Sequence, residues 1–277
     1  MRKLEAKLGS RLFHRTTRTV RITPDGEQLL NRAKALIAEL DEIETLFSGT
    51  ANLRGRVRID MPVTVARNIV IPRLRELLSA HPQLEIQLST TDRLVDVVRE
   101  GFDCVLRVGQ LSDSALVATR IGELEMVNCA SPSYLQAYGT PRALADLEHH
   151  VLVHYASTMS STVAELEWEE HGRTRARRLP CLVTVNSTDA FLAACLAGLG
   201  IAQIPRYGIV PLLESGQLVE VLPLARCAPL PVSLLHAHGR RVPRRVRAVM
   251  DWLIAVITPH FSTRPRGAHG GVPAWRS

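Results

Sequence analysis

The segment from Gly9 to Gly26 alternates arginine and threonine between two turn signals and leads directly into a long heptad pattern. The stretch from Arg2 to Arg21 around it holds seven lysine or arginine residues and one acidic residue, a net charge of +6. Positive charge concentrated on a short hairpin favours a phosphate backbone as its partner, and a solvated basic surface is the alternative. The sequence therefore predicts a basic wing joined to a long helix.

The positive charge of the chain is confined to its two ends. The net charge is +7, yet residues 22–237 hold 19 basic and 25 acidic side chains, while residues 238–277 hold eight arginines and one acid. The last part, residues 262–277, is rich in Gly, Pro and Arg, so we expect a disordered tail.

Length and composition predict a globular protein. With 277 residues and 46% hydrophobic content, the chain can bury one or two cores. It has no apolar run near the roughly 20 residues that cross a bilayer, and no secretory signal, so we expect a cytoplasmic protein without membrane contact. Its five cysteines are widely spaced in apolar contexts, which indicates buried reduced thiols, and we predict no metal and no cofactor.

A seam of apolar residues at heptad spacing follows the Pro24-Asp25-Gly26 turn. It predicts a linker and dimerisation helix over residues 25–48, followed by a hinge over residues 49–55. The alternative is a single amphipathic helix packed on its own domain. The seam consists of Leu29, Ala33, Leu36, Leu40, Ile43 and Phe47.

Beyond the hinge, strands alternate with helices. We expect strands at residues 57–61, 84–88 and 103–108, a helix after Pro62 with Ile69, Leu74, Leu77 and Leu78 facing inward, and a helix from Asp92 to Arg99. This order predicts a doubly wound parallel sheet.

A second set of elements predicts a second lobe. It comprises an extended stretch at 116–130, helices at 132–138 and 188–197, and strands near 151–154, 179–185 and 201–204. The strand at 231–236 and the helix at 242–257 should return to the first sheet. We therefore assign residues 56–129 and 231–261 to lobe I and residues 130–230 to lobe II, with a ligand-binding cleft between them.

Polar residues at predicted strand ends and helix starts are the candidate ligand contacts, since open α/β sheets bind ligands there. Hydroxyls and free N–H groups suit a small carboxylate or another polar anion. Helix capping is an equally good explanation for Thr64, Asp92, Ser187 or Thr188 taken singly. The candidates are Pro62, Val63, Thr64, Thr90, Thr91, Asp92, Ser187, Thr188, Ile204 and Pro205.

Several strings resemble the LysR-type transcriptional regulators. They are KLEAKLG at 3–9, LFHRTTR at 12–18, ITPDG at 22–26, REGFDCVLRVG at 99–109, and AGLGIA at 197–202 followed by Ile204-Pro205. The resemblance spans residues 1 to about 260. It implies an α/β, two-lobed effector domain like the type II periplasmic binding proteins, preceded by a partial winged-helix segment at residues 1–24 and the linker helix.

The resemblance implies a homodimeric or homotetrameric regulator whose promoter binding responds to a small-molecule effector held between the lobes. The DNA contacts would come from Arg2, Lys3, Arg11, Arg15, Thr16, Thr17, Arg18 and Arg21. The reader of this family normally begins about forty residues earlier. We therefore expect a truncated gene model or fragment that starts inside the recognition helix and reads DNA sequence poorly.

A second departure concerns Asp92, where many relatives place Thr. An acid there would disfavour a carboxylate effector in contact with it.

The rival functions are an enzyme and a free-standing binding protein. His236 and His238 share one strand face but lack an evident third metal ligand, and no nucleophile and base are paired, so we predict no catalytic residue. A cytosolic, oligomeric small-molecule-binding protein without DNA binding is the stronger rival.

Overall fold

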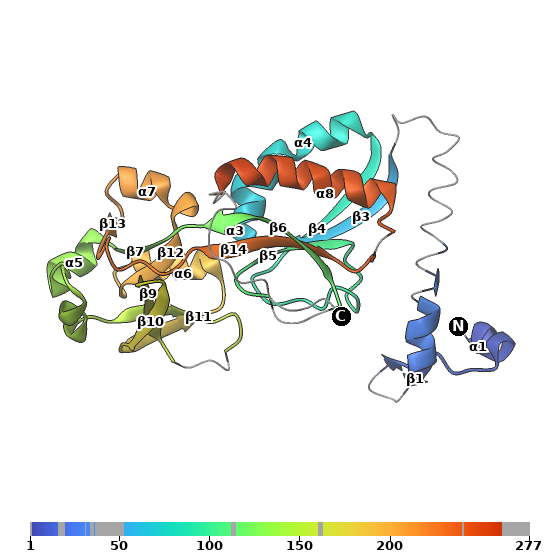
Figure 1. Cartoon of the computed structure of the whole chain (residues 1–277), viewed down its shortest axis with the longest axis horizontal. Helices are drawn as coiled ribbons and strands as arrows, with labels where there is room; N and C mark the ends of the chain where they lie inside the picture. Colours follow the sequence, from blue (N-terminus) through green and yellow to red (C-terminus); the bar gives the residue numbers. More distant parts are fainter. Residues whose placement is uncertain are drawn as a thin grey trace.

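The computed structural model describes residues 2–15, 20–30, 32–33, 36, 53–111, 115–159, 163–239 and 241–261. They form a small N-terminal unit and two α/β lobes (Figure 1). No helix in these ranges is long and apolar enough to cross a membrane. Several predictions lie outside the described residues, namely those on Thr16, Thr17, Arg18, Leu40, Ile43, Phe47, the start of the hinge and the 262–277 tail.

The N-terminal unit consists of a helix, a hairpin and the start of a second helix. Helix α1 (Arg2–Leu8) ends at Gly9, whose φ of +67° suits glycine. Strands β1 (Phe13–Arg15) and β2 (Val20–Ile22) pair antiparallel, with Phe13 opposite Ile22, and form the predicted wing. The Glu5 carboxylate accepts hydrogen bonds from the backbone N–H of Leu12 at 2.9 Å and ties α1 to β1.

The Thr-Pro-Asp-Gly turn starts the next helix, described over residues 24–30. The Thr23 hydroxyl accepts from the N–H of Gly26 at 3.0 Å, which is the geometry of an N-cap. A Cβ at Gly26 would lie 2.2 Å from the carbonyl oxygen of Leu12, so only glycine fits where this helix meets the wing. Of the predicted seam, Leu29 and Ala33 are partly buried, and Leu36 is exposed.

Lobe I is built on a five-stranded mixed sheet with the order β4-β3-β5-β14-β6. Strands β3, β4 and β5 are parallel as predicted, but β14 runs antiparallel to both β5 and β6, so the sheet is not parallel throughout. The strands are β3 (Arg54–Met61), β4 (Gln83–Thr90), β5 (Cys104–Val108), β6 (Val117–Leu124) and β14 (Leu230–His236).

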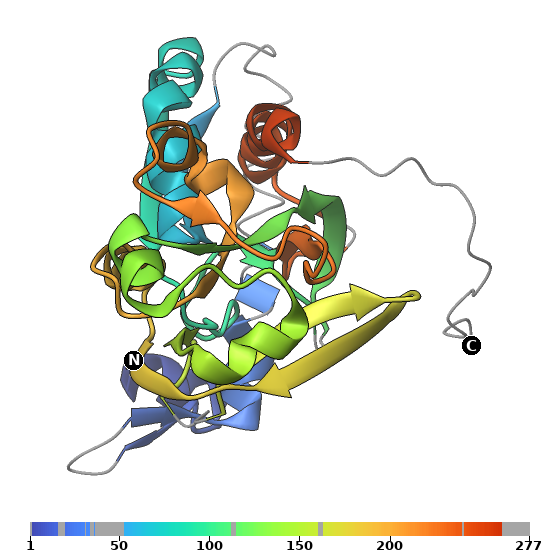
Figure 2. The ribbon, with the colours of Figure 1, turned by 90° about the vertical axis from the view of Figure 1, so that its left-hand side faces the viewer.

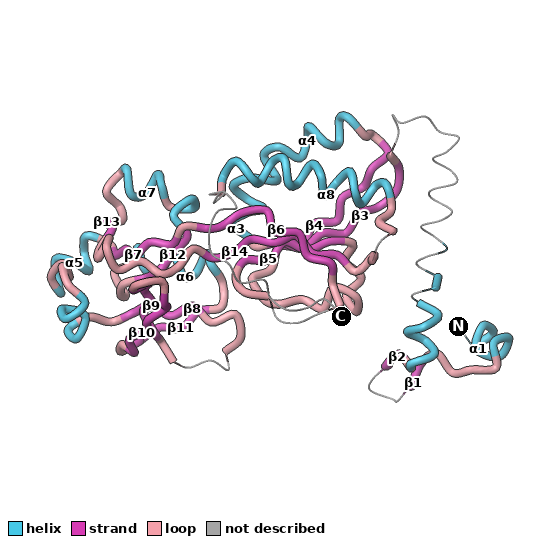
Figure 3. The backbone as a smooth tube through the Cα atoms, in the orientation of Figure 1, coloured by secondary structure: helices cyan, strands magenta, loops and turns pink. Residues whose placement is uncertain are grey.

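Two helical segments cover the same face of this sheet (Figures 1 and 3). The first runs through α3 (Val63–Val65), a π-helical turn (Ala66–Val70) and α4 (Ile71–Ala80), and the second is α8 (Arg244–Ile257). The predicted inward residues Ile69 and Leu77 are buried, whereas Leu74 and Leu78 are only partly covered. The apolar rows of β3 and α8 are buried in the core of this lobe and contribute to its hydrophobic stabilisation.

The opposite face is covered by turns, and here the prediction of a helix from Asp92 to Arg99 is wrong. The Glu100 carboxylate accepts from both the Arg93 side chain and the Asp96 N–H, and the Asp96 carboxylate accepts from the Arg99 N–H. These carboxylates accept from two N–H groups that a helix would pair with backbone carbonyls, while the N–H of Glu100 keeps a helical bond to the Asp96 carbonyl oxygen; the segment folds as a chain of turns.

Lobe II contains a sheet with the order β12-β7-β13, and β8 joins its edge through a bridge between Leu152 and Ile201, with β11 paired to β8. Its strands and helices are β7 (Met126–Ala130), β8 (Leu152–Tyr155), β11 (Cys181–Val185), β12 (Ala202–Pro205), β13 (Val219–Glu220), α5 (Pro132–Tyr138), α6 (Thr188–Leu196) and α7 (Val210–Glu214). Short 3₁₀ turns occur at Leu144–His149 and Arg206–Gly208 of this lobe, and another, Thr258–His260, follows α8 of lobe I.

A hairpin that the sequence analysis missed adds to lobe II. Strands β9 (Glu165–Glu170) and β10 (Arg173–Arg178) pair antiparallel and project from the lobe, as Figure 2 shows. Acidic residues on β9 face arginines on β10, including Glu165 opposite Arg178. Leu166 lies in the core of the lobe.

The glycine-rich loop at 197–202 owes its composition to a close approach between strands. A Cβ at Gly200 would lie 2.8 Å from the Val151 carbonyl oxygen and 2.9 Å from the backbone of Leu152 and Val153. Glycine therefore lets β12 bond to β8 at this point.

The chain crosses between the lobes twice. Only Glu125 separates β6 from β7, and residues 221–229 lead from β13 back to β14. Arg226 on the second crossing pairs with Glu125 on the first at 2.6 Å. Arg226 and Arg206 also hold Glu220, and although burial acts to raise the pKa of that carboxyl, their hydrogen bonds lower it overall. These ion pairs therefore tie the two interlobe crossings to each other.

All five cysteines are free thiols. Cys104, Cys129 and Cys195 are buried as predicted, and burial raises the pKa of Cys104 to about 12. The prediction of burial is wrong for Cys181 and Cys227, which are partly exposed.

The polar contact buried most deeply in lobe I joins Asp60 to Arg107. Asp60 is fully buried, and one oxygen accepts from Arg107 Nη1 at 2.8 Å while the other accepts from the Thr91 hydroxyl at 3.1 Å. Loss of one partner from such a pair leaves the other charge buried without compensation.

We expect Asp60→Ala to lower the free energy of unfolding by about 3–5 kcal/mol. The control is Glu85→Ala, which breaks the ion pair between Glu85 and Arg56. Because these side chains are 57% and 55% exposed, the substitution should lower the free energy of unfolding by less than about 1 kcal/mol. Urea unfolding of both variants measures the difference. Equal losses would mean that the buried pair has no special role.

Candidate functional site

The lobes meet where helices of each begin. The α3 helix starts directly after β3 of lobe I, and α6 starts three residues after β11 of lobe II; residues of the two helices approach one another. The first N–H groups of a helix have no partner within the helix, so this lobe boundary has the kind of donors that bind anions in other α/β proteins.

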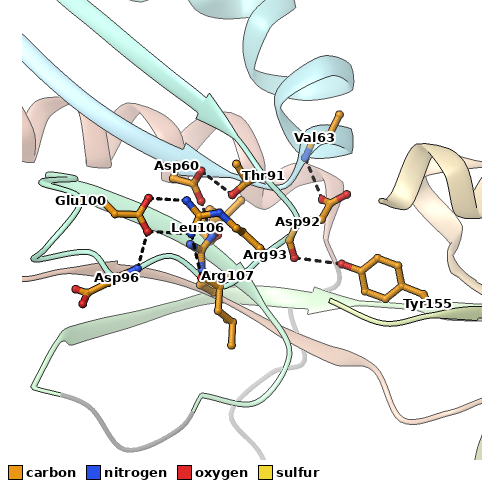
Figure 4. A network of polar contacts seen from close by, with 11 residues as sticks. Asp60, Val63, Thr91, Asp92, Arg93, Asp96, Glu100, Leu106, Arg107 and Tyr155 are labelled. Atoms are coloured by element: carbon orange, nitrogen blue, oxygen red, sulfur yellow. Dashed lines mark hydrogen bonds and ion pairs between the residues drawn. The ribbon is translucent and has the colours of Figure 1, made fainter. Parts of the chain in front are cut away.

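Asp92 occupies the lobe boundary. Its Oδ2 accepts from the backbone N–H of Thr188 at 2.7 Å and from the Thr188 hydroxyl at 2.9 Å, and its Oδ1 accepts from the N–H of Val63 at 3.4 Å. Figure 4 shows the carboxylate turned toward Val63 and away from the Asp60–Arg107 pair. A lobe I side chain therefore caps helix α6 of lobe II, whose own N-cap residue, Ser187, makes no side-chain cap bond.

Two tyrosines of lobe II reach across to lobe I. The Tyr155 hydroxyl donates to the backbone oxygen of Asp92 at 3.2 Å, and the Tyr207 hydroxyl donates to Thr64 Oγ1 at 2.8 Å. Burial raises the pKa of Tyr155 to about 12, and the negative charge of Asp92 adds to the shift. Burial also raises the pKa of Tyr207. Both hydroxyls therefore stay protonated and able to donate at neutral pH.

An exposed ion pair closes the outer edge of the lobe boundary. Arg67, in the π-helical turn after α3, donates to Asp189 of α6 at 2.9 Å. The two side chains are 51% and 45% exposed, so solvent screens this pair. π-Helical turns often occur at functional sites, and here the turn places Arg67 opposite α6.

The predicted ligand contacts separate into two groups. Val63, Thr64, Asp92 and Thr188 come together at the lobe boundary. The others do not join them through hydrogen bonds. Thr91 turns inward to Asp60, Thr90 is exposed, and Ile204 is buried in the core of lobe II, while Pro62, Ser187 and Pro205 are partly buried at element ends.

Sequence reasoning missed Tyr155, Tyr207, Arg67 and Asp189. Tyr155 ends β8 and Tyr207 lies two residues beyond β12, so the rule that selected the other strand ends would have included both tyrosines. The cross-lobe Arg67–Asp189 pair has no signal in the sequence.

The basic N-terminal unit is the second candidate site. Lys3 and Arg11 are exposed, and Arg2, Arg15 and Arg21 lie on α1, β1 and β2. A hairpin with an arginine on each strand, together with a basic helix, can contact phosphates along a duplex.

The described residues hold no cluster of three or more potential metal ligands. His236 and His238 have ring centroids 6.0 Å apart, and His238 lies 3.5 Å from Asp103.

Comparison with known families follows this division of the chain. Residues 50–257 match the model of the LysR substrate binding domain, and residues 1–27 match that of the bacterial regulatory helix-turn-helix protein, lysR family.

Individual relatives are also transcriptional regulators of the helix-turn-helix type. The chain is 40% identical to YhjC of Escherichia coli, an uncharacterized HTH-type transcriptional regulator, over 93% of this chain and 87% of that protein. It is 31% identical to an HTH-type transcriptional repressor of Pseudomonas aeruginosa, over 91% and 80%. The full-length structure of the Vibrio cholerae virulence activator AphB matches 92% of this chain and 87% of its own, with a TM-score of 0.63 and 26% identity. This chain belongs to the LysR family of transcriptional regulators.

Proposed function

We propose that the chain regulates transcription by binding promoter DNA through its basic N-terminal unit, in response to a small-molecule effector at the lobe boundary. The observation that carries the proposal is the meeting of α3 and α6, where hydrogen bonds from both lobes converge. A ligand that binds there favours one angle between the lobes over another, and its differential affinity for the two arrangements drives the response.

The same proposal covers the remaining parts of the chain. The helix that begins at residue 24 would pair two copies through Leu29, Ala33, Leu36, Leu40, Ile43 and Phe47, in a homodimer or homotetramer. Arg2, Lys3, Arg11, Arg15, Thr16, Thr17, Arg18 and Arg21 would contact DNA. The effector contacts would be Pro62, Val63, Thr64, Thr90, Thr91, Asp92, Ser187, Thr188, Ile204 and Pro205. We propose a cytoplasmic protein without catalytic residues.

The DNA-binding role predicts a change in salt dependence. In a chain extended upstream of Met1, Arg15→Ala and Arg18→Ala should each weaken binding about equally for all sequences and reduce the slope of log affinity against log salt by about one. Fluorescence anisotropy with a labelled duplex at several salt concentrations measures both effects.

The control is Arg99→Ala, because Arg99 is an exposed arginine of lobe I and should leave the slope unchanged. An unchanged slope in Arg15→Ala and Arg18→Ala would contradict the role of the wing. If neither the chain nor its extended form shifts DNA in a gel, the free-standing binding protein becomes the better description.

The different exposure of the two cross-lobe contacts predicts that their contributions to stability respond differently to salt. Tyr207→Phe removes a largely buried hydrogen bond and should lower the free energy of unfolding by about 1 kcal/mol at low and high salt alike. Asp189→Ala removes an exposed ion pair, so its smaller cost should vanish near 0.5 M NaCl. Urea unfolding at two salt concentrations tests this.

Thr64→Val provides the check on Tyr207→Phe, since the two residues share one hydrogen bond. Their combined effect should be smaller than the sum of the two single effects. Simple additivity would show that the hydroxyl of Tyr207 stabilises the protein through some other contact.

A further inference from the structure

The carboxylate of Asp92 is held by donors that a free anion would otherwise use. Three of them, the N–H and hydroxyl of Thr188 and the N–H of Val63, belong to the first turns of helices in different lobes. Helix N-termini favour negative charge, and hydrogen bonds to a carboxylate are about twice as strong as those between neutral groups. Asp92 therefore connects the two lobes with charge-assisted bonds.

The backbone around Asp92 is fixed from both sides. The N–H of the preceding residue, Thr91, donates to the carbonyl oxygen of Met61 at 3.2 Å, and the Tyr155 hydroxyl donates to the carbonyl oxygen of Asp92 itself. The side chain thus reaches the lobe boundary from a short, anchored turn and needs little further ordering to bind there.

The neighbouring cations are already engaged elsewhere. Arg93 forms two hydrogen bonds with Glu100, at 2.9 and 2.6 Å, and Arg107 is paired with Asp60 (Figure 4). Among the described residues, the Asp92 carboxylate accepts from two backbone N–H groups and a hydroxyl, which is the donor set expected for a bound organic acid.

We propose that Asp92 is a tethered ligand of this boundary: its carboxylate holds the lobes together in place of a free carboxylate. The inference rests on the proposed function only in placing the effector at the same boundary. A tethered group acts at a high effective concentration, so a small carboxylate does not displace it, and the wild-type site admits effectors that bind beside Asp92 without using these donors.

The test is chemical rescue of the full chain. Asp92→Gly removes the side chain and leaves room for acetate, so its Tm should fall by about 3–8 °C. Sodium acetate at about 100 mM should restore at least half of that loss, as expected for a ligand that binds only the folded state. Sodium chloride at equal ionic strength and acetamide, a neutral molecule of the same shape, should not.

Asp96→Gly is the matched control, because Asp96 lies in the same run of turns and accepts one backbone N–H, but is exposed and does not join the lobes. Its Tm, and that of the wild type, should move by less than about 1 °C with acetate. Asp92→Ala with formate repeats the experiment with a smaller cavity and a less flexible backbone, in case the glycine variant does not fold.

The proposal is overturned if Asp92→Gly melts at the temperature of Asp96→Gly, or if acetate stabilises it no more than chloride does. Neither readout involves DNA, so failure of the proposed regulatory function would leave the rescue intact, and failure of the rescue would leave DNA binding untouched.

Discussion

The antiparallel insertion of β14 between β5 and β6 determines the architecture of the chain. Because β14 comes from the far end of the sequence and completes the sheet of lobe I, all of lobe II is a single excursion between β6 and β14. Two short crossings are the covalent links that result, and Arg226 ties them together through Glu125 and Glu220. A lobe joined only by these two crossings can rotate about them, so the few contacts at the lobe boundary decide the angle between the two lobes.

Patterns of apolar residues were sufficient to locate most helices and strands of both lobes. The buried strands β3, β5 and β14 and the amphipathic helix α8 were located within a few residues, because burial on one or both faces dictates their composition. The direction of β14 has no such signature, since the same apolar strand fits a sheet in either orientation. Its antiparallel pairing is set by where the preceding crossing returns.

The elements and contacts that the sequence did not predict correctly have local physical causes. The segment after Asp92 has good helical capping residues, yet it forms turns. The carboxylates of Glu100 and Asp96 accept from the N–H groups of Asp96 and Arg99. The β9–β10 hairpin was missed because its strands are unusually charged, although His171-Gly172, both with positive φ, forms its turn. At the lobe boundary, the strand-end rule found Asp92 and Thr188 but could not reveal that they bind each other, because that contact spans 96 residues.

The distribution of charge bears on how such a regulator would approach DNA. At physiological ionic strength, charges act over roughly 8 Å, so the net charge of +7 matters less than the charge next to the duplex. The stretch from Arg2 to Arg21 has a net charge of +6, whereas residues 53–261, which form both lobes, hold 22 basic and 20 acidic side chains, a net charge of only +2. Phosphates would therefore attract the wing more strongly than the nearly neutral lobes. Because the field of the wing is stronger than that of the lobes, electrostatics would favour encounters in which the wing is the surface next to the duplex.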